Sequence, residues 1–358
     1  MLYHWLYPLS QNYHLFNVFK YITTRSFMAF IIATIVSIVW GKYFIALMKL
    51  RQFGQTIRDE GPESHKKKKG TPTFGGVFII GSTIISCIIC GNFVSFPFLM
   101  ALFVTISYFF LGGLDDYLKV LKKNTKGVNA KQKLVWQFAT ALIAGYVIIK
   151  FGITDSKLYF PFIKDPLIDI GWLYVPFAAF VIVGSSNALN LTDGLDGLAI
   201  GPTIISAATL GFLAYLAGHS ELASYLFIPH VPDVGELLVL VAAVIGAGVG
   251  FLWYNAYPAE IFMGDVGSLS LGGCLGTMAV LTKNEFLFVL IGGIFVIEAV
   301  SVILQVASFK TRGKRIFKMA PIHHHFELKG WPETKVIVRF WIISLVFAIL
   351  ALATLKLR

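Results

Sequence analysis

Residues 237–253 read LLVLVAAVIGAGVGFLW, a run in which no side chain is charged. Such a run is typical of a helix that crosses a bilayer, whose hydrocarbon core requires about 20 mostly apolar residues. The rest of the chain is similar, because 56% of the 358 residues are hydrophobic and only 14% are charged. Soluble domains typically have about 25% charged residues. The composition therefore excludes an ordinary soluble fold and predicts an all-α, polytopic membrane protein.

Ten apolar stretches of helical length occur along the chain. They cover residues 27–48, 74–91, 94–113, 134–151, 171–187, 199–218, 235–253, 266–282, 286–308 and 336–355. These stretches are continuous rather than alternating, which excludes an outer-membrane barrel, and their apolar content excludes disorder. No internal repeat and no separate soluble segment is visible. We therefore expect about ten transmembrane helices in one domain over residues 1–358, with a short tail before the first helix.

Positive charge is concentrated in three loops. The loops after the first, third and ninth stretches hold 20 of the 30 Lys and Arg residues, whereas the even-numbered loops hold few: Lys157, Lys164 and Lys283. Cytoplasmic loops are enriched in Lys and Arg. We therefore expect the odd-numbered loops in the cytoplasm and both termini in the periplasm. The net charge of +11 is interpreted as topology, not as a sign of a nucleic-acid partner.

Acidic residues gather in the same odd-numbered loops. Asp115 and Asp116 follow the third stretch beside six lysines. Adjacent carboxylates repel, which favours a shared cation or proton and suits a base or an anchor near a phosphate. Asp265 precedes the eighth stretch, where it offers Mg²⁺ a hard oxygen ligand and the helix start offers N–H groups to a phosphate. The alternative is that all three are ordinary helix caps.

The fifth loop, residues 187–197, carries two acids and no cation. Asp193 and Asp196 share one face if the segment is helical. Gly194 and Gly197 allow a ligand to approach the backbone. The same residues are also common in plain turns, so a structural interpretation stays open.

Three consecutive histidines, His323, His324 and His325, occupy the ninth loop. Neighbouring side chains diverge, so we do not expect the three to converge on one zinc ion. One imidazole facing a phosphate is the better interpretation. Together the loops supply the groups of a phosphoryl-transfer site, which positions substrates and neutralises charge. The residues alone thus predict Mg²⁺-dependent transfer of a phosphate-linked group to a membrane lipid.

These motifs resemble the polyprenyl-phosphate N-acetylhexosamine-1-phosphate transferase superfamily over essentially the whole chain. Residues 320–327, 329–333 and 338–341 discriminate best, supported by 70–76 and 190–197. They are most similar to the phospho-N-acetylmuramoyl-pentapeptide transferases of bacterial cell-wall synthesis. The resemblance implies a homodimer in the bacterial inner membrane that uses Mg²⁺. The implied reaction moves phospho-MurNAc-pentapeptide from UDP-MurNAc-pentapeptide to undecaprenyl phosphate, giving lipid I and UMP.

The resemblance also implies roles for individual residues. Asp265 would ligate Mg²⁺, Asp115 and Asp116 would serve the lipid phosphate, and His324 would complete the catalytic set. The implied substrate-binding residues are Lys68, Thr73, Lys133, Asn190, Asp193, Asp196, Asn255 and Phe262. The sequence leaves a covalent aspartyl-phosphate open. We favour direct attack, because a lipid phosphate oxyanion is already a competent nucleophile.

The ninth stretch contains an acid, Glu298, and a Gly292-Gly293 pair. An ionisable group within a span is a functional candidate, and a hydrogen bond to a neighbouring helix near a bend is the alternative. We expect a groove beside this stretch to receive the isoprenoid chain.

Three other functions compete with this transfer reaction. A sibling transferase would use UDP-N-acetylglucosamine, but the histidine motif favours the muramoyl peptide. A transporter would place its acids near the bilayer centre on broken, repeated helices, whereas most acids here lie at helix ends. A structural scaffold would leave the acidic loops five and seven unexplained.

Overall fold

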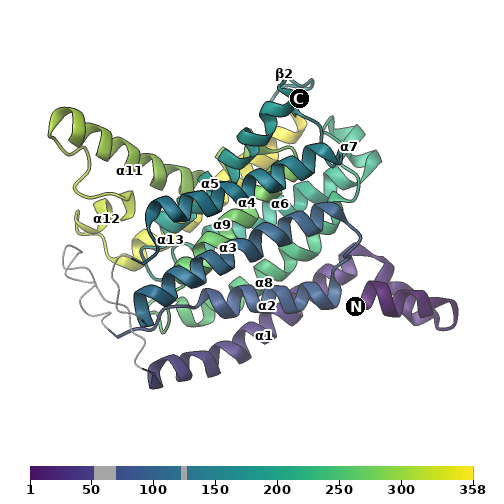
Figure 1. Cartoon of the computed structure of the whole chain (residues 1–358), viewed down its shortest axis with the longest axis horizontal. Helices are drawn as coiled ribbons and strands as arrows, with labels where there is room; N and C mark the ends of the chain where they lie inside the picture. The colour runs from purple at the N-terminus through teal and green to yellow at the C-terminus, as the bar shows by residue number, and fades with distance from the viewer. Residues whose placement is uncertain (52–69, 122–126, 358) are drawn as a thin grey trace.

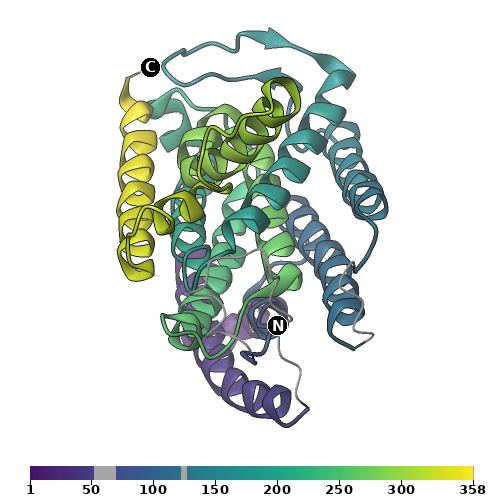
Figure 2. The same ribbon diagram turned by 90° about the vertical axis from the view of Figure 1, so that its left-hand side faces the viewer.

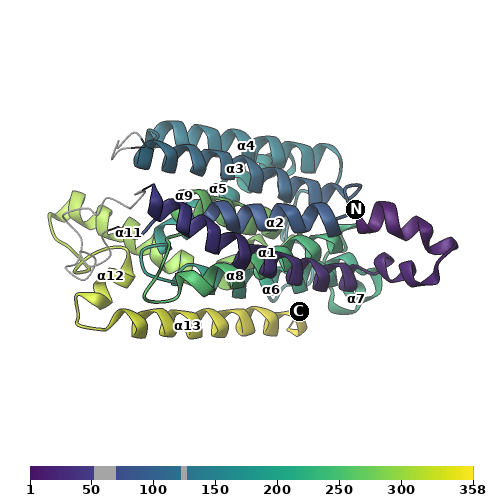
Figure 3. The same cartoon turned by 90° about the horizontal axis from the view of Figure 1, so that it is seen from below.

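The computed structural model describes residues 1–51, 70–121 and 127–357. Its long helices run side by side as one bundle (Figure 1). The N- and C-termini lie toward the same end of this bundle, and the loop that carries the histidines lies at the other (Figures 1 and 3). We call these the terminal end and the loop end. Figure 2 looks along the bundle from the loop end.

All ten apolar stretches are helical. In chain order they form α1 (Ile22–Leu50), α2 (Gly76–Cys90), α3 (Phe96–Leu121), α4 (Ala130–Lys150), α5 (Tyr174–Thr192), α6 (Ile200–Gly218), α8 (Leu237–Asn255), α9 (Gly264–Leu281), the pair α10 (Glu285–Ile291) and α11 (Gly293–Arg312), and α13 (Glu333–Ala353). Within the described residues, nine helices are long and apolar enough to cross a membrane. The prediction of a helical, polytopic membrane protein is therefore confirmed.

Two of the ten stretches differ from a simple span. With 15 residues, α2 rises only about 22 Å, and it packs against α1, α8 and α9 within the bundle. The ninth stretch is two helices, because the chain leaves helical geometry at Gly292 (φ −88°, ψ 24°) between α10 and α11. Glycine is a poor helix former and tolerates such a break.

Short elements connect the long helices. The tail forms η1 (Leu2–Leu6), η2 (Tyr7–Gln11) and η3 (His14–Lys20), and the other short helices are η5 (Gly171–Leu173), α7 (Ser220–Leu226), η6 (Val234–Glu236), α12 (Ile322–Glu327) and η7 (Thr354–Lys356). The strands β1 (Lys157–Leu158) and β2 (Ile168–Asp169) pair antiparallel, with Lys157 opposite Asp169. Among the described residues, this hairpin departs from the all-α prediction.

The centre of the bundle is α9, which packs against α2, α3, α5, α6 and α10. Its side chains from Val266 to Leu281 are all buried. Small residues allow helix backbones to approach closely in membranes. Residue 112 of α3 must be a glycine, because a Cβ there would overlap the backbone of Asp265. This crossing brings the end of α3 against the start of α9.

Candidate active site

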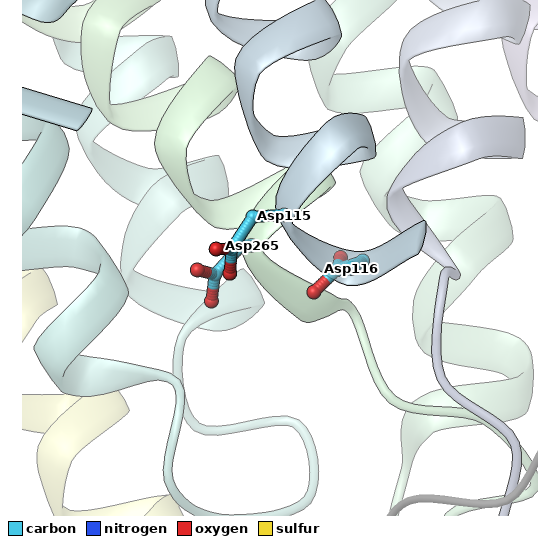
Figure 4. A group of neighbouring side chains, drawn as sticks. All are labelled: Asp115, Asp116 and Asp265. Carbon is cyan, nitrogen blue, oxygen red and sulfur yellow. The ribbon is translucent and has the colours of Figure 1, made fainter. Parts of the chain in front are cut away.

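The site is formed where α3 ends and α9 begins. Asp115 and Asp116 lie in the last turns of α3, and Asp265 is the second residue of α9. One carboxylate oxygen from each lies within 4.8 Å of the others (Figure 4). Asp115 and Asp116 are buried, whereas the side chain of Asp265 keeps 15% of its surface exposed. The three aspartates form a buried acidic cluster that opens toward solvent through Asp265.

Two lysines neutralise part of this acidic cluster. Lys119 Nζ lies 2.6 Å from Asp115 Oδ2 and 3.2 Å from Asp265 Oδ2. Lys133 Nζ, in the first turn of α4, lies 2.7 Å and 2.6 Å from the same two oxygens. Each ammonium group thus bridges α3 and α9. Within the described residues, two lysines contact a cluster of three carboxylates.

The N-terminus of α9 is bound by aspartates of the protein. Val266 N–H donates to Asp116 Oδ2 over 3.0 Å, and the backbone of Gly264 lies close enough to Asp193 to lower the pKa of its carboxyl. Carboxylates are favourable here because a helix start exposes unpaired N–H groups and a partial positive charge. The sequence suggested these N–H groups for a phosphate, but in the structure Asp116 accepts from that of Val266.

Asp193 follows α5 and reaches toward the acidic cluster. Burial, together with the charges of Asp265, Asp116 and Asp196, raises the pKa of this carboxyl to about 7. Asn190, one turn earlier, accepts a hydrogen bond of 2.8 Å from Ser268 of α9. The end of α5 therefore lies against the start of α9, as a shared site requires.

Asp196 shares no helix face with Asp193, because residues 193–199 form turns rather than a helix. Its Oδ2 accepts from Ala259 N–H over 3.0 Å. Asn255 has a similar role, since Oδ1 accepts from Gly197 N–H over 2.9 Å and Nδ2 donates to Ile261 over 2.8 Å. Asp196 and Asn255 thus join the loop after α5 to the loop after α8.

The loop after α8 also pairs with the segment before α2. Phe262 N–H donates to Pro72 over 2.9 Å, and Gly75 N–H donates to the carbonyl of Phe262 over 2.8 Å. Thr73 is buried beside Gly264, where a Cβ on the glycine would lie 3.0 Å from Thr73 Oγ1. Thr73 and Asp116 therefore both lie beside Gly264, and Phe262 precedes this glycine by two residues.

The known proteins to which this chain is similar are transferases. A family model described as Glycosyl transferase family 4 matches residues 98–283. Over its whole length the chain is 54% identical to a protein of Citrifermentans bemidjiense and 53% identical to one of a Geobacter strain, both named phospho-N-acetylmuramoyl-pentapeptide-transferase. A protein of Pelobacter propionicus with the same name is 54% identical, again over the full length of both chains. The chain belongs to the phospho-N-acetylmuramoyl-pentapeptide-transferase family.

The family match places the acidic cluster inside the transferase region. Asp115, Asp116 and Asp265 fall within residues 98–283, together with Lys133 and the loops after α5 and α8. Thr73 and His324 lie outside that range but within the full-length matches. The chain is accordingly an enzyme of this family, built into a multi-pass membrane protein.

The three histidines of this transferase have three different partners. His323 Nδ1 lies 3.0 Å from Glu298 Oε1, His324 Nδ1 lies 2.8 Å from Glu327 Oε2, and His325 Nδ1 accepts from Lys318 N–H over 3.0 Å. In the described part of the chain, the cluster suited to a metal is formed by aspartates, not histidines. The three imidazoles thus have separate partners, although the rings of His323 and His324 lie 4.1 Å apart.

Sequence reasoning missed Lys119 as a site residue of this transferase. Its signal was the spacing of four residues from Asp115, which places both on one face of a helix. The apolar run ended at residue 113, but α3 continues to Leu121. The predicted Lys68 lies outside the described residues, and the structure therefore does not place it.

Proposed function

We propose that this enzyme transfers phospho-MurNAc-pentapeptide from UDP-MurNAc-pentapeptide to undecaprenyl phosphate, giving lipid I and UMP. This is the first membrane step of peptidoglycan synthesis. The observation that carries the proposal is the acidic cluster, with Lys119 and Lys133, in a chain whose full-length relatives bear the transferase name. Buried carboxylates next to cations suit a reaction whose substrates are phosphates.

The acidic cluster fits Mg²⁺. Its three carboxylates offer hard oxygen ligands within 4.8 Å of one another, and Mg²⁺ is usually bound by one or two carboxylates plus substrate phosphates. Asp265 is the proposed main ligand, since its side chain is the most accessible of the three. When bound, the ion would neutralise charge on the diphosphate.

The residues of the chain would then position two phosphates. Lys133 and Lys119 would turn from the carboxylates toward phosphate oxygens, since ammonium groups on flexible stems bind phosphate as point charges. Asp193, Asn190, Asp196, Asn255, Thr73 and Phe262 would shape the nucleotide side, directly or by holding its loops. An oxygen of the lipid phosphate attacks the phosphorus attached to the sugar, the bridging P–O bond breaks, and UMP leaves.

The proposed step is direct attack, with no phosphorylated aspartate. Asp115 and Asp116 are buried and bound by Lys119 and by Val266 N–H, which suits anchoring groups better than nucleophiles. Incubation with labelled nucleotide substrate and no lipid tests this. Trapping of a phosphorylated enzyme that goes on to form product when lipid is added would contradict direct attack.

We propose that the loop end faces the cytoplasm and that both termini are periplasmic. The cysteines Cys87, Cys90 and Cys274 are buried, so a cysteine introduced on the surface can be labelled selectively. In intact cells an impermeant maleimide should label Lys157→Cys in β1 and spare Thr311→Cys near the end of α11. The reverse pattern would overturn the orientation.

The isoprenoid chain is proposed to lie beside α11. This helix projects from the rest of the bundle (Figure 1). Its outer face carries apolar side chains that are exposed in the structure, Ile297, Val300, Ile303, Leu304 and Val306. A photoreactive polyprenyl phosphate should crosslink to this face, and crosslinks confined to α1 or α4 would contradict it. A homodimer remains our expectation for the assembly.

Release of UMP by purified enzyme in detergent tests the proposed function. UDP-MurNAc-pentapeptide with undecaprenyl phosphate should give UMP and a labelled lipid in equal amounts, with no transmembrane gradient required. UDP-N-acetylglucosamine in the same assay distinguishes the sibling activity. A faster reaction with UDP-N-acetylglucosamine would replace the proposed substrate, and no reaction with either nucleotide would overturn the function.

A further inference from the structure

Glu298 and His323 form a buried pair outside the acidic cluster. Glu298 lies within α11, and His323 lies in α12, which follows it in the chain. Neither side chain has appreciable exposed surface. Nδ1 of His323 lies 3.0 Å from Oε1 of Glu298, so the intramembrane acid has a partner outside its own helix. Glu298 is bonded to a neighbouring element, and that element reaches the site.

The other edge of the His323 ring lies against Gly194. A Cβ at position 194 would overlap Nε2 and Cε1 of the imidazole, so a glycine is required at this point of the turn. Within the described residues Nε2 has no hydrogen-bond partner. The ring therefore contacts the turn by packing alone, while Glu298 holds the Nδ1 side of the ring.

Further contacts hold the same turn from the C-terminal part of the chain. Asp196 N–H donates to Glu333 Oε1 over 3.1 Å, and Trp341 Nε1 donates to the Gly197 carbonyl over 3.2 Å. These bonds fix the second half of the turn against α13. His323 packs against the first half, next to Asp193, whose carboxylate reaches the start of α9.

We propose that Glu298 is a positioning residue, which holds Asp193 in place against the start of α9 through His323 and Gly194. The inference rests on the proposed function only in assigning Asp193 to the substrate site. A residue that acts in this way touches no substrate. The position of Asp193 matters because a displacement of about 1 Å in a site can lower a rate by about 100-fold.

Hydrogen–deuterium exchange tests the positioning without any substrate. Glu298→Ala should speed exchange in a peptide containing residues 193–197 and leave residues 234–240 unchanged. The matched control is Glu236→Ala, which also removes a buried, ion-paired carboxylate, but at the terminal end. It should speed exchange around residue 236 and spare the turn. Equal effects of both variants on both peptides would overturn the proposal.

Kinetics test the consequence for the reaction. Per nucleotide-binding site, Glu298→Ala should lower kcat about 10- to 100-fold, whereas Glu236→Ala should lower thermal stability and leave kcat per site unchanged. Glu298→Gln keeps an oxygen that accepts from Nδ1, so it should retain kcat within about threefold. A Gln variant as impaired as the Ala variant would contradict positioning by a hydrogen bond. An inactive wild-type enzyme would instead overturn the proposed function and leave the exchange result standing.

A double-mutant cycle provides an independent check. Gly194→Ala should push the imidazole away and reproduce the kinetic defect of Glu298→Ala. If both act through His323, the double variant should be no slower than the slower single variant, because coupled residues are not additive. Defects that multiply would show that Glu298 and Gly194 act separately.

Discussion

The two ends of the bundle both bury charge, but they balance it differently. At the terminal end, Arg25 of α1 binds Glu236 of η6 through two bonds of 2.8 Å, and both are buried. At the loop end, the described residues place Asp115, Asp116 and Asp265 beside two lysines. The first arrangement is neutral within itself, and the second has one carboxylate more than it has ammonium groups.

The difference separates a structural ion pair from a binding site. Burying a charge is costly unless a partner compensates it, and Arg25 and Glu236 compensate each other fully. The acidic cluster is not compensated by the protein alone, so it gains from a cation supplied with the substrates. Sites of function commonly sacrifice stability in this way.

The largest effect is expected from a substitution in the acidic cluster at the loop end. Asp265→Asn should lower the rate of UMP release by about 1,000-fold or more, because charge neutralisation on a phosphate contributes several kcal/mol to the transition state. Thermal unfolding should become somewhat easier, since the substitution also removes the ion pairs of Asp265 with Lys119 and Lys133, so turnover is compared per folded molecule. Normal turnover in this variant would revive the interpretation of the protein as a scaffold.

The next largest effect is expected at the terminal end, as a loss of stability without a loss of turnover. Arg25→Met should lower the free energy of unfolding by about 3–5 kcal/mol, because it leaves Glu236 buried without its partner. Adding Glu236→Leu should recover much of this loss. Unfolding followed by tryptophan fluorescence measures both variants, and turnover per folded molecule serves as the control. A double variant as unstable as the single one would contradict the neutral-pair account.

The helices and the acidic residues at their ends could be predicted from the sequence, because both depend on residues that are close together in the chain. Apolar runs gave all ten helical stretches, and the acids at their ends gave Asp115, Asp116, Asp193 and Asp265. The partner of Arg25 could not be foreseen, since Glu236 lies 211 residues away. Nor could the sequence show that Asn255, expected to bind substrate, holds a backbone group of Gly197, which lies 58 residues away.

A smaller effect is expected at Lys119, which the sequence did not single out. Lys119→Ala should slow turnover about 10-fold, because Lys133 still neutralises Asp115 and Asp265. Lys119→Arg should retain more activity, since the charge is kept. Steady-state kinetics with both variants measure this. A Lys119→Ala enzyme with unchanged turnover would show that its ion pairs are only structural.

The smallest expected effect is a change in pH dependence. The folded pKa of Asp193 is raised to about 7, above its value of about 4 in an unfolded chain. The folded state therefore binds this proton more tightly, and the associated stability is present below about pH 4 and is lost as the pH rises through 7. With chelator present, Asp193→Asn should unfold at a higher temperature than wild type at pH 8, with little difference at pH 5. Parallel curves would contradict the raised pKa.

The most direct test of the excess carboxylate at the loop end is a magnesium titration of lipid I formation by the purified wild-type enzyme. Product should form with saturating dependence on Mg²⁺, only when undecaprenyl phosphate is present, and EDTA should abolish it. Undiminished product in EDTA, or UMP released without the lipid, would contradict a cation-dependent transfer site built on Asp115, Asp116 and Asp265.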